Sequence, residues 1–265
     1  MSEFAARPSP RAAPGRDALH VLWHDLECGR YAEDLSLWLE LAREAGPPAA
    51  PILDLGAGTG RVALELARAG HEVLALDCDL LLLAALRERA GALPVETACA
   101  DARDFQLDRR DFSLALAPMQ TIQLLGGAEA RARMLRSVLA HLAPGGLLAC
   151  ALADAIEGFD AEHTEPPLPD VLERDGWVYA SQPVAMRPDA DGTTIERIRQ
   201  TVAPDGTRTA EGDSVRLDRL DGDTLEAEGV AVGFHAAGRR FIEMTDEHVG
   251  SEVVLLAAPP EDARA

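Results

Sequence analysis

Apolar and polar residues follow two different periods along this chain. Residues 51–155 carry short apolar runs such as "PILDLG", "EVLALD" and "FSLALAP", separated by segments with apolar residues at helical spacing. The short runs predict buried strands, and the helical spacing predicts helices between them. Because the connections are short, we predict an α/β fold, with a doubly wound parallel sheet covered by helices on both faces.

The pattern differs on either side of this region. Residues 18–46 keep one helical period and predict a helix that ends at "GPP". After residue 155, three stretches of strand character at 176–186, 193–203 and 207–220 are separated by turn signals and predict a small antiparallel β insertion. A predicted helix and two predicted strands after residue 221 then return to the core.

These changes of pattern predict the organisation of the chain. In order, we expect a disordered arm (1–16), an α/β core (17–155), the antiparallel β insertion (156–218), a C-terminal helix and strands that complete the core (219–258), and a flexible tail (259–265). No apolar run has the length of about 18 residues that a membrane span requires, so no membrane partner is expected.

Composition excludes several kinds of chemistry. The net charge is −20, and all 25 basic residues are arginine. The absence of lysine excludes a Walker-type phosphate loop and a pyridoxal phosphate Schiff base. Such an acidic chain repels a phosphate backbone, so no nucleic-acid partner is expected. Four cysteines occur singly, which is typical of reduced thiols in a cytoplasmic protein, and no metal site is predicted.

Candidate binding chemistry follows the first predicted strand. In "LDLGAGTGR" the glycines Gly56, Gly58 and Gly60 alternate with other residues, which lets the backbone turn sharply and approach a ligand. The next helix would direct its free amides at that ligand. Asp77 ends the second strand, where a carboxylate accepts ribose hydroxyls. Asp54 precedes the loop and suits a cation better than a pyrophosphate.

Together these residues resemble the class I S-adenosylmethionine-dependent methyltransferases of small molecules. The resemblance rests on "LDLGAGTGRVALELARAGHEVLALD", "ADARDF" and "LAPGG" and covers roughly residues 20–155. It implies a Rossmann-like sheet of seven strands, the last antiparallel, and S-adenosyl-L-methionine as cofactor, with S-adenosyl-L-homocysteine as product. The expected cofactor-binding residues are Tyr31, Asp54, Gly56, Ala57, Gly58, Asp77, Cys78, Asp101, Ala102 and Pro118.

The resemblance leaves the methyl acceptor open. After the fourth strand this chain has "APMQ" in place of the "[DN]PP[YF]" of enzymes that methylate base nitrogens, so a small-molecule acceptor, nitrogen or oxygen, is expected. Met119, Gln120 and Gln123 are candidate substrate contacts, and His24 and His163 are candidate catalytic bases. The insertion would form a substrate wall, a homodimer surface or both. The alternatives are a nicotinamide-dependent oxidoreductase and a catalytically silent methyltransferase-like binding protein.

Overall fold

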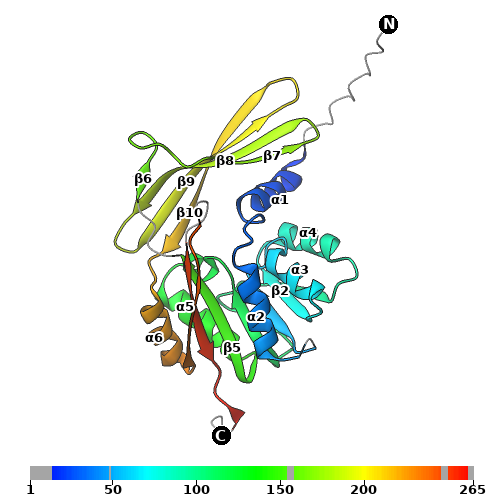
Figure 1. Ribbon diagram of the computed structural model, residues 1–265, viewed down its shortest axis with the longest axis vertical. Coiled ribbons are helices and arrows are strands. Elements are labelled where there is room, and N and C mark those ends of the chain that lie inside the picture. Colours follow the sequence, from blue (N-terminus) through cyan, green and yellow to red (C-terminus); the bar gives the residue numbers. More distant parts are fainter. Residues whose placement is uncertain (1–13, 48, 154–157, 246–249, 262–265) are drawn as a thin grey trace.

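Two sheets dominate the computed structural model, which describes residues 14–47, 49–153, 158–245 and 250–261 (Figure 1). The larger sheet consists of β1 (Ile52–Leu55), β2 (Val73–Asp77), β3 (Val95–Cys99), β4 (Phe112–Ala117), β5 (Leu142–Ala153), β11 (His235–Ile242) and β12 (Ser251–Ala257). Its spatial order is β11-β12-β5-β4-β1-β2-β3. The strands from β5 to β3 run parallel, and β12 runs antiparallel to β5. This confirms the predicted doubly wound sheet of seven strands.

Helices cover both faces of this sheet because its strands are apolar on both sides. One face packs on α2 (Leu35–Ala45), α3 (Arg61–Arg68) and α4 (Leu80–Ala90), and the other on α5 (Ala128–Leu139) and α6 (Gly222–Val232). In β1, Ile52 belongs to the first core, whereas Leu53 and Leu55 belong to the second. This period of two sends successive side chains to opposite faces.

The single helix predicted for residues 18–46 is wrong. The structure has two helices there, α1 (Arg16–Glu27) and α2, separated by a turn at Cys28–Arg30 and a short irregular segment. Asp34, at the N-cap of α2, is fully buried and accepts a hydrogen bond from Trp38 Nε1 at 2.7 Å. Both segments keep helical periodicity, so spacing alone did not reveal the break.

The boundaries differ in other places too. Helix α1 begins inside the predicted arm, and residues 1–13 lie outside the described residues, as do 262–265 of the predicted tail. The "LAPGG" segment of the family resemblance forms the first part of β5. Leu142 of this segment pairs with Phe112 of β4, and the register between β4 and β5 shifts before the next pair, Leu114 with Leu147. The start of β5 is therefore irregular.

The smaller sheet is antiparallel and contains β6 (Phe159–Asp160), β7 (Asp170–Arg174), β8 (Trp177–Pro188), β9 (Gly192–Val202) and β10 (Arg208–Asp218). Strands β8, β9 and β10 are the predicted meander, and β6 and β7 were not predicted. In Figure 1 this sheet lies above the core sheet, and α1 lies between β7 and α4.

The smaller sheet is fixed to the core at its last strand. Asp218 of β10 accepts hydrogen bonds from the Gly127 amide (2.6 Å) and from Nη1 of Arg131 (3.0 Å), and Arg131 also pairs with Glu228 of α6 (2.6 Å). The Arg131 side chain is 5% exposed. The two sheets therefore meet at a buried ionic junction. Among the described residues, no helix is long and apolar enough to cross a membrane.

Candidate functional site

The glycine-rich loop lies at the carboxyl end of β1, against the ends of β2 and β4. Gly56 has φ of 67° and Gly58 has φ of 53°, a left-handed conformation that favours glycine. A Cβ atom at Gly56 would lie 2.8 Å from Cγ2 of Thr121, and one at Gly58 would lie 2.4 Å from Cε1 of His24. The loop thus needs glycine both for its conformation and for close approach.

Asp77 connects this loop to the end of β2. Its Oδ2 accepts a hydrogen bond from the Gly58 amide at 2.8 Å, and its Oδ1 accepts one from the Asp79 amide at 2.9 Å. A carboxylate has about four lone-pair sites, so each oxygen can accept one more donor. The side chain is therefore oriented by backbone amides and retains capacity for two hydroxyl groups.

Asp54 is the least satisfied polar side chain of the site. It is 1% exposed, and neither carboxylate oxygen has a hydrogen-bond partner of good geometry among the described residues. Burial raises the pKa of Asp54 to about 7, although Arg61 and the Ala63 amide act in the opposite direction. A buried carboxylate in this state favours a nearby cation.

If Asp54 contacts the cofactor as predicted, its carboxyl group makes cofactor binding dependent on pH. We expect affinity for S-adenosylhomocysteine to rise as pH increases through about 7, because only ionised Asp54 attracts the ligand's ammonium group. Without cofactor, the raised pKa means that the folded state binds a proton more tightly than the unfolded state does. The free energy of unfolding should therefore fall as the pH rises from about 4, the ordinary carboxyl pKa, to about 7. Calorimetric titrations and thermal melts across this range measure both trends. An Asp54→Asn variant that keeps the wild-type pH dependence would contradict this assignment.

A cavity of about 140 Å³ lies beside the loop and brings together residues from four parts of the chain. Its lining includes seven residues that were predicted for the site: His24, Asp54, Gly56, Ala57, Pro118, Met119 and Gln120. It also includes residues that were not predicted: Cys28, Arg61, Val62, Thr121 and Leu124. Cys28 follows His24 by four positions, the spacing of one helix face, which was the one sequence signal for it.

His24 lines this cavity and lies next to Gly58 of the loop. Its Nδ1 atom is buried without a hydrogen-bond partner among the described residues. Burial lowers the pKa of His24, although Asp25 and Asp77 oppose this effect. The imidazole is therefore neutral at neutral pH and can accept a proton.

Arg61 forms the wall next to the loop and fixes the start of α2. Its guanidinium binds both carboxylate oxygens of Asp34, at 2.5 and 2.7 Å, and donates to the Tyr31 carbonyl at 2.9 Å. The Arg61 side chain is 10% exposed. Its presence at the position after the third glycine is thus explained by a buried, bidentate ion pair.

Helix α1 is held on both sides of the cavity. Toward the core, Asp25 binds Arg89 of α4 (2.5 and 2.8 Å) and Thr59 (2.8 Å). Toward the smaller sheet, Glu27 is 7% exposed, accepts hydrogen bonds from Ser181 and Arg199 at 2.7 Å and forms an ion pair with Arg197 at 2.8 Å. We call Glu27, Ser181, Arg197 and Arg199 the Glu27 cluster.

Apolar and aromatic contacts reinforce the Glu27 cluster. Leu22, Trp23 and Leu26 of α1 pack against Tyr179 of β8, and the rings of Trp23 and Tyr179 meet edge to face with centroids 5.8 Å apart. The guanidinium of Arg199 lies over the Trp23 ring at 5.8 Å. The smaller sheet therefore shares its core with α1.

The other predicted cofactor residues lie around the loop. Tyr31 lies outside the cavity lining, beneath the Arg61 guanidinium at 5.2 Å, and Cys78 and Asp101 follow β2 and β3. Asp101 pairs with Arg103 at 2.5 Å, and half-buried Ala102 packs against the core. The contact of these four residues with the cofactor stays a prediction.

Gln123, a predicted substrate contact, uses its amide within the protein. It is 5% exposed, its Nε2 donates to the Asp218 carbonyl at 3.2 Å, and its Oε1 accepts from the Ala153 amide at 2.8 Å. These bonds connect the end of β5 with the end of β10.

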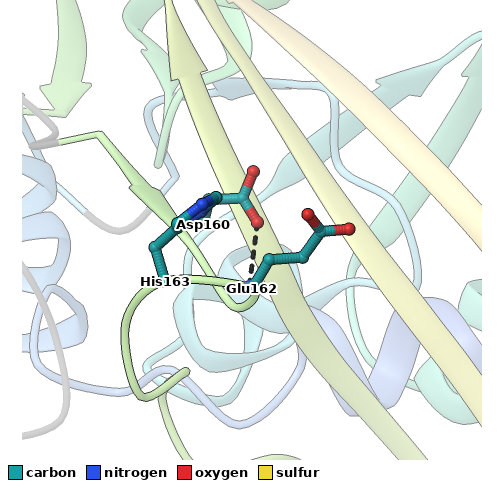
Figure 2. A group of neighbouring side chains, drawn as sticks. All are labelled: Asp160, Glu162 and His163. Atoms are coloured by element: carbon teal, nitrogen blue, oxygen red, sulfur yellow. Dashed lines mark hydrogen bonds between the residues drawn. The ribbon is translucent and has the colours of Figure 1, made fainter.

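His163, the second predicted base, lies in the turn after β6, outside the cavity lining. Figure 2 shows it near Asp160 and Glu162, and ligand atoms of the three residues lie within 4.8 Å of one another. Asp160 already pairs with Arg187 at 2.8 Å and accepts a hydrogen bond from the Glu162 amide at 3.0 Å. The Asp160 carboxylate therefore has partners within the protein.

The residues around the loop fit the chemical groups of S-adenosylmethionine. The unpaired carboxylate of Asp54 suits an ammonium or sulfonium cation, and the free lone pairs of Asp77 suit the ribose hydroxyls. Gly56 and Gly58 carry no side chain themselves, and the side chains of Thr121 and His24 lie next to them. The fit rests on this donor and acceptor set.

Comparisons with known proteins agree with this fit. Residues 52–146 match a family model described as a methyltransferase domain. A cypemycin N-terminal methyltransferase from Streptomyces sp. is 33% identical over 44% of this chain and 49% of its own length, so the match spans about half of that relative. A dTDP-3-amino-3,4,6-trideoxy-α-D-glucopyranose N,N-dimethyltransferase from Streptomyces venezuelae is 28% identical over 71% of this chain and 67% of its own length.

A solved structure extends the likeness to nearly the whole chain. The glycopeptide N-methyltransferase MtfA, complexed with S-adenosyl-L-methionine, superposes with a TM-score of 0.55 and is 27% identical. The superposition covers 88% of this chain and 97% of MtfA. The matched methyltransferase domain contains the glycine loop, Asp54 and Asp77 in the positions described above. In its fold, its loop and these matches the chain is similar to S-adenosylmethionine-dependent methyltransferases, and residues 52–146 form its methyltransferase domain.

Proposed function

We propose that this protein transfers a methyl group from S-adenosylmethionine to the amine nitrogen of a small molecule, such as an amino sugar. The observation that carries the proposal is the cavity at the ends of β1 and β4. There an unpaired buried carboxylate, Asp54, and a neutral imidazole, His24, lie within one lining. The first suits the cofactor's positive charge, and the second suits an acceptor that must lose a proton.

Three similar proteins support a nitrogen acceptor over oxygen. By their names, they methylate a peptide N-terminus, an amino sugar and a glycopeptide nitrogen. Their acceptors differ in scaffold and share an amine. A protein of net charge −20 also attracts cationic amines from solution.

The roles of individual residues follow from their positions. The cofactor, when bound, supplies a methyl group already activated by the sulfonium. Catalysis then requires mainly that the acceptor be held close and in line, which contributes up to roughly 7–11 kcal/mol. Met119 and Gln120 line the cavity after β4, which supports a role in orienting the acceptor. His24 lines the same cavity, which supports a role in accepting the proton that an ammonium acceptor loses before transfer.

The proposal is tested with matched acceptors. The protein is incubated with S-adenosylmethionine and either an amino sugar or the sugar with hydroxyl in place of amine, and products are analysed by mass spectrometry. We expect the amino sugar to be methylated and the hydroxyl compound to stay unmodified. The His24→Gln variant should methylate the amino sugar more slowly than wild type, and the difference in rate should become smaller as the pH rises. Methylation of the hydroxyl compound would favour an oxygen acceptor. Cofactor binding without turnover on any amine would favour the silent binding protein, and binding of a nicotinamide dinucleotide would favour the oxidoreductase.

A small-molecule acceptor also implies that nucleic acids do not bind. The chain has no lysine and a net charge of −20, so tRNA and duplex DNA should be repelled even at low salt. Gel mobility shifts at micromolar protein measure this. A retained, salt-sensitive complex would contradict the small-molecule proposal.

A further inference from the structure

A second cavity, of about 430 Å³, lies on another face of α1. Leu22, Asp25 and Leu26 of α1 line it, whereas His24 and Cys28 line the cavity of about 140 Å³ beside the glycine loop. By helical geometry these two sets point in different directions from α1. The remaining walls come from the segment after α1, from α3 and α4, and from β7. Its size is within the range of small-molecule sites.

The cavity combines an apolar floor with a basic rim. Five leucines contribute to its lining: Leu22, Leu26, Leu35, Leu64 and Leu172. Five arginines also line it, against two acidic residues: Arg30, Arg61, Arg68, Arg89 and Arg174, with Asp25 and Glu65. This local excess of positive charge is unusual for a protein whose net charge is −20.

Two of these arginines are available to a ligand. Arg61 and Arg89 are held by Asp34 and Asp25 in bidentate pairs, and Arg68 pairs with Glu65. Arg30 and Arg174 are exposed, and neither has an ion-pair or hydrogen-bond partner for its guanidinium among the described residues. They come from opposite walls, one after α1 and one from β7. Guanidinium groups bind phosphate oxygens in bidentate geometry, so this pair suits a phosphate.

We propose that this cavity is a binding site for a phosphate-bearing organic anion, with its phosphates between Arg30 and Arg174 and its apolar body on the leucines. The ligand could be the phosphate end of a nucleotide-linked acceptor or a separate small phosphate. Both ligands would present the same phosphate oxygens to Arg30 and Arg174. The proposal goes beyond methyl transfer, because the cavity lies on another face of α1 than His24; it shares Arg61 with the cavity beside the glycine loop, and Tyr31 is the predicted cofactor residue in its lining.

Uridine diphosphate and inorganic pyrophosphate are suitable probes. Each is titrated calorimetrically into the full chain at low salt, with saturating S-adenosylhomocysteine so that the nucleotide cannot occupy the cofactor site. We expect both to bind, uridine diphosphate more tightly because the leucines contact its base, and binding to weaken as salt increases. The double variant Arg30→Gln/Arg174→Gln should bind at least tenfold more weakly. Arg208→Gln, an exposed arginine on β10, is the matched control.

The outcomes separate the two ligand sources and can overturn the site. Competition between uridine diphosphate and a nucleotide-linked amine acceptor, but not an amine acceptor without phosphate, identifies the phosphate end of the acceptor as the ligand. Binding without competition identifies a separate phosphate, and either result supports the site. Absence of saturable binding, or equal affinity in wild type and in a double variant with an unchanged melting temperature, overturns it. Neither outcome bears on amine methylation, which is measured with an acceptor that carries no phosphate.

Discussion

Replacing Asp77 by alanine is expected to weaken S-adenosylhomocysteine binding at least tenfold while the chain stays folded. The variant loses an acceptor for two ribose hydroxyls, and hydrogen bonds to a charged group contribute about 1.5–3 kcal/mol each. It also frees the Gly58 and Asp79 amides, which Asp77 holds at 2.8 and 2.9 Å. The ribose contact and the loop geometry are therefore lost together.

Calorimetry on the purified variant measures this loss, and circular dichroism verifies the fold. The matched control is Asp111→Ala, which removes a 63% exposed carboxylate at the opposite end of the sheet. It should bind the ligand like wild type. Wild-type affinity in a folded Asp77→Ala variant would remove Asp77 from the cofactor site.

Replacing Glu27 by alanine is expected to destabilise the chain by about 3 kcal/mol, near the lower end of the range for breaking a buried ion pair. The variant leaves Arg197 and Arg199, which are 17% and 21% exposed, with the more distant Asp213 carboxylate, at 3.8 and 3.2 Å, in place of the closer Glu27. It also releases α1 from the smaller sheet, so His24 loses its fixed position above the loop. Methyl transfer should therefore decrease as well.

Urea unfolding measures the first effect and acceptor kinetics the second. Glu129→Ala, which removes a 92% exposed carboxylate from α5, is the control and should change neither. Glu27→Gln should recover part of the stability because it keeps the size and some hydrogen bonds. Equal stability of Glu27→Ala and wild type would show that other contacts hold α1.

The same cluster predicts how stability responds to acid. Burial alone would raise the pKa of Glu27, but Arg199, Arg197 and Ser181 outweigh it, and the pKa is lowered. A lowered folded pKa means that the stabilisation is present above the ordinary glutamate pKa and is lost as pH falls through the folded value. Wild type should therefore lose more stability in acid than Glu27→Ala.

The sequence by itself determined the core fold and the centre of the cofactor site. Strands and helices of the core were visible because apolar runs and helical spacing are local patterns. The positions of Gly56, Gly58 and Asp77 were visible for a related reason: each directly follows or ends a strand. Parallel strands bring their carboxyl ends to one edge of the sheet, so order along the chain was enough to place these residues together.

Only the tertiary structure decided how the site is enclosed. Glu27 and Arg199 are 172 residues apart, and nothing in the spacing around either one indicates the other. The same holds for Arg61 with Asp34, and for Gln123, whose amide joins two strand ends. The break between α1 and α2 was missed because both keep helical spacing, whereas their separation depends on a buried ion pair. Such contacts depend on the path of the whole chain, and local periodicity carries no information about that path.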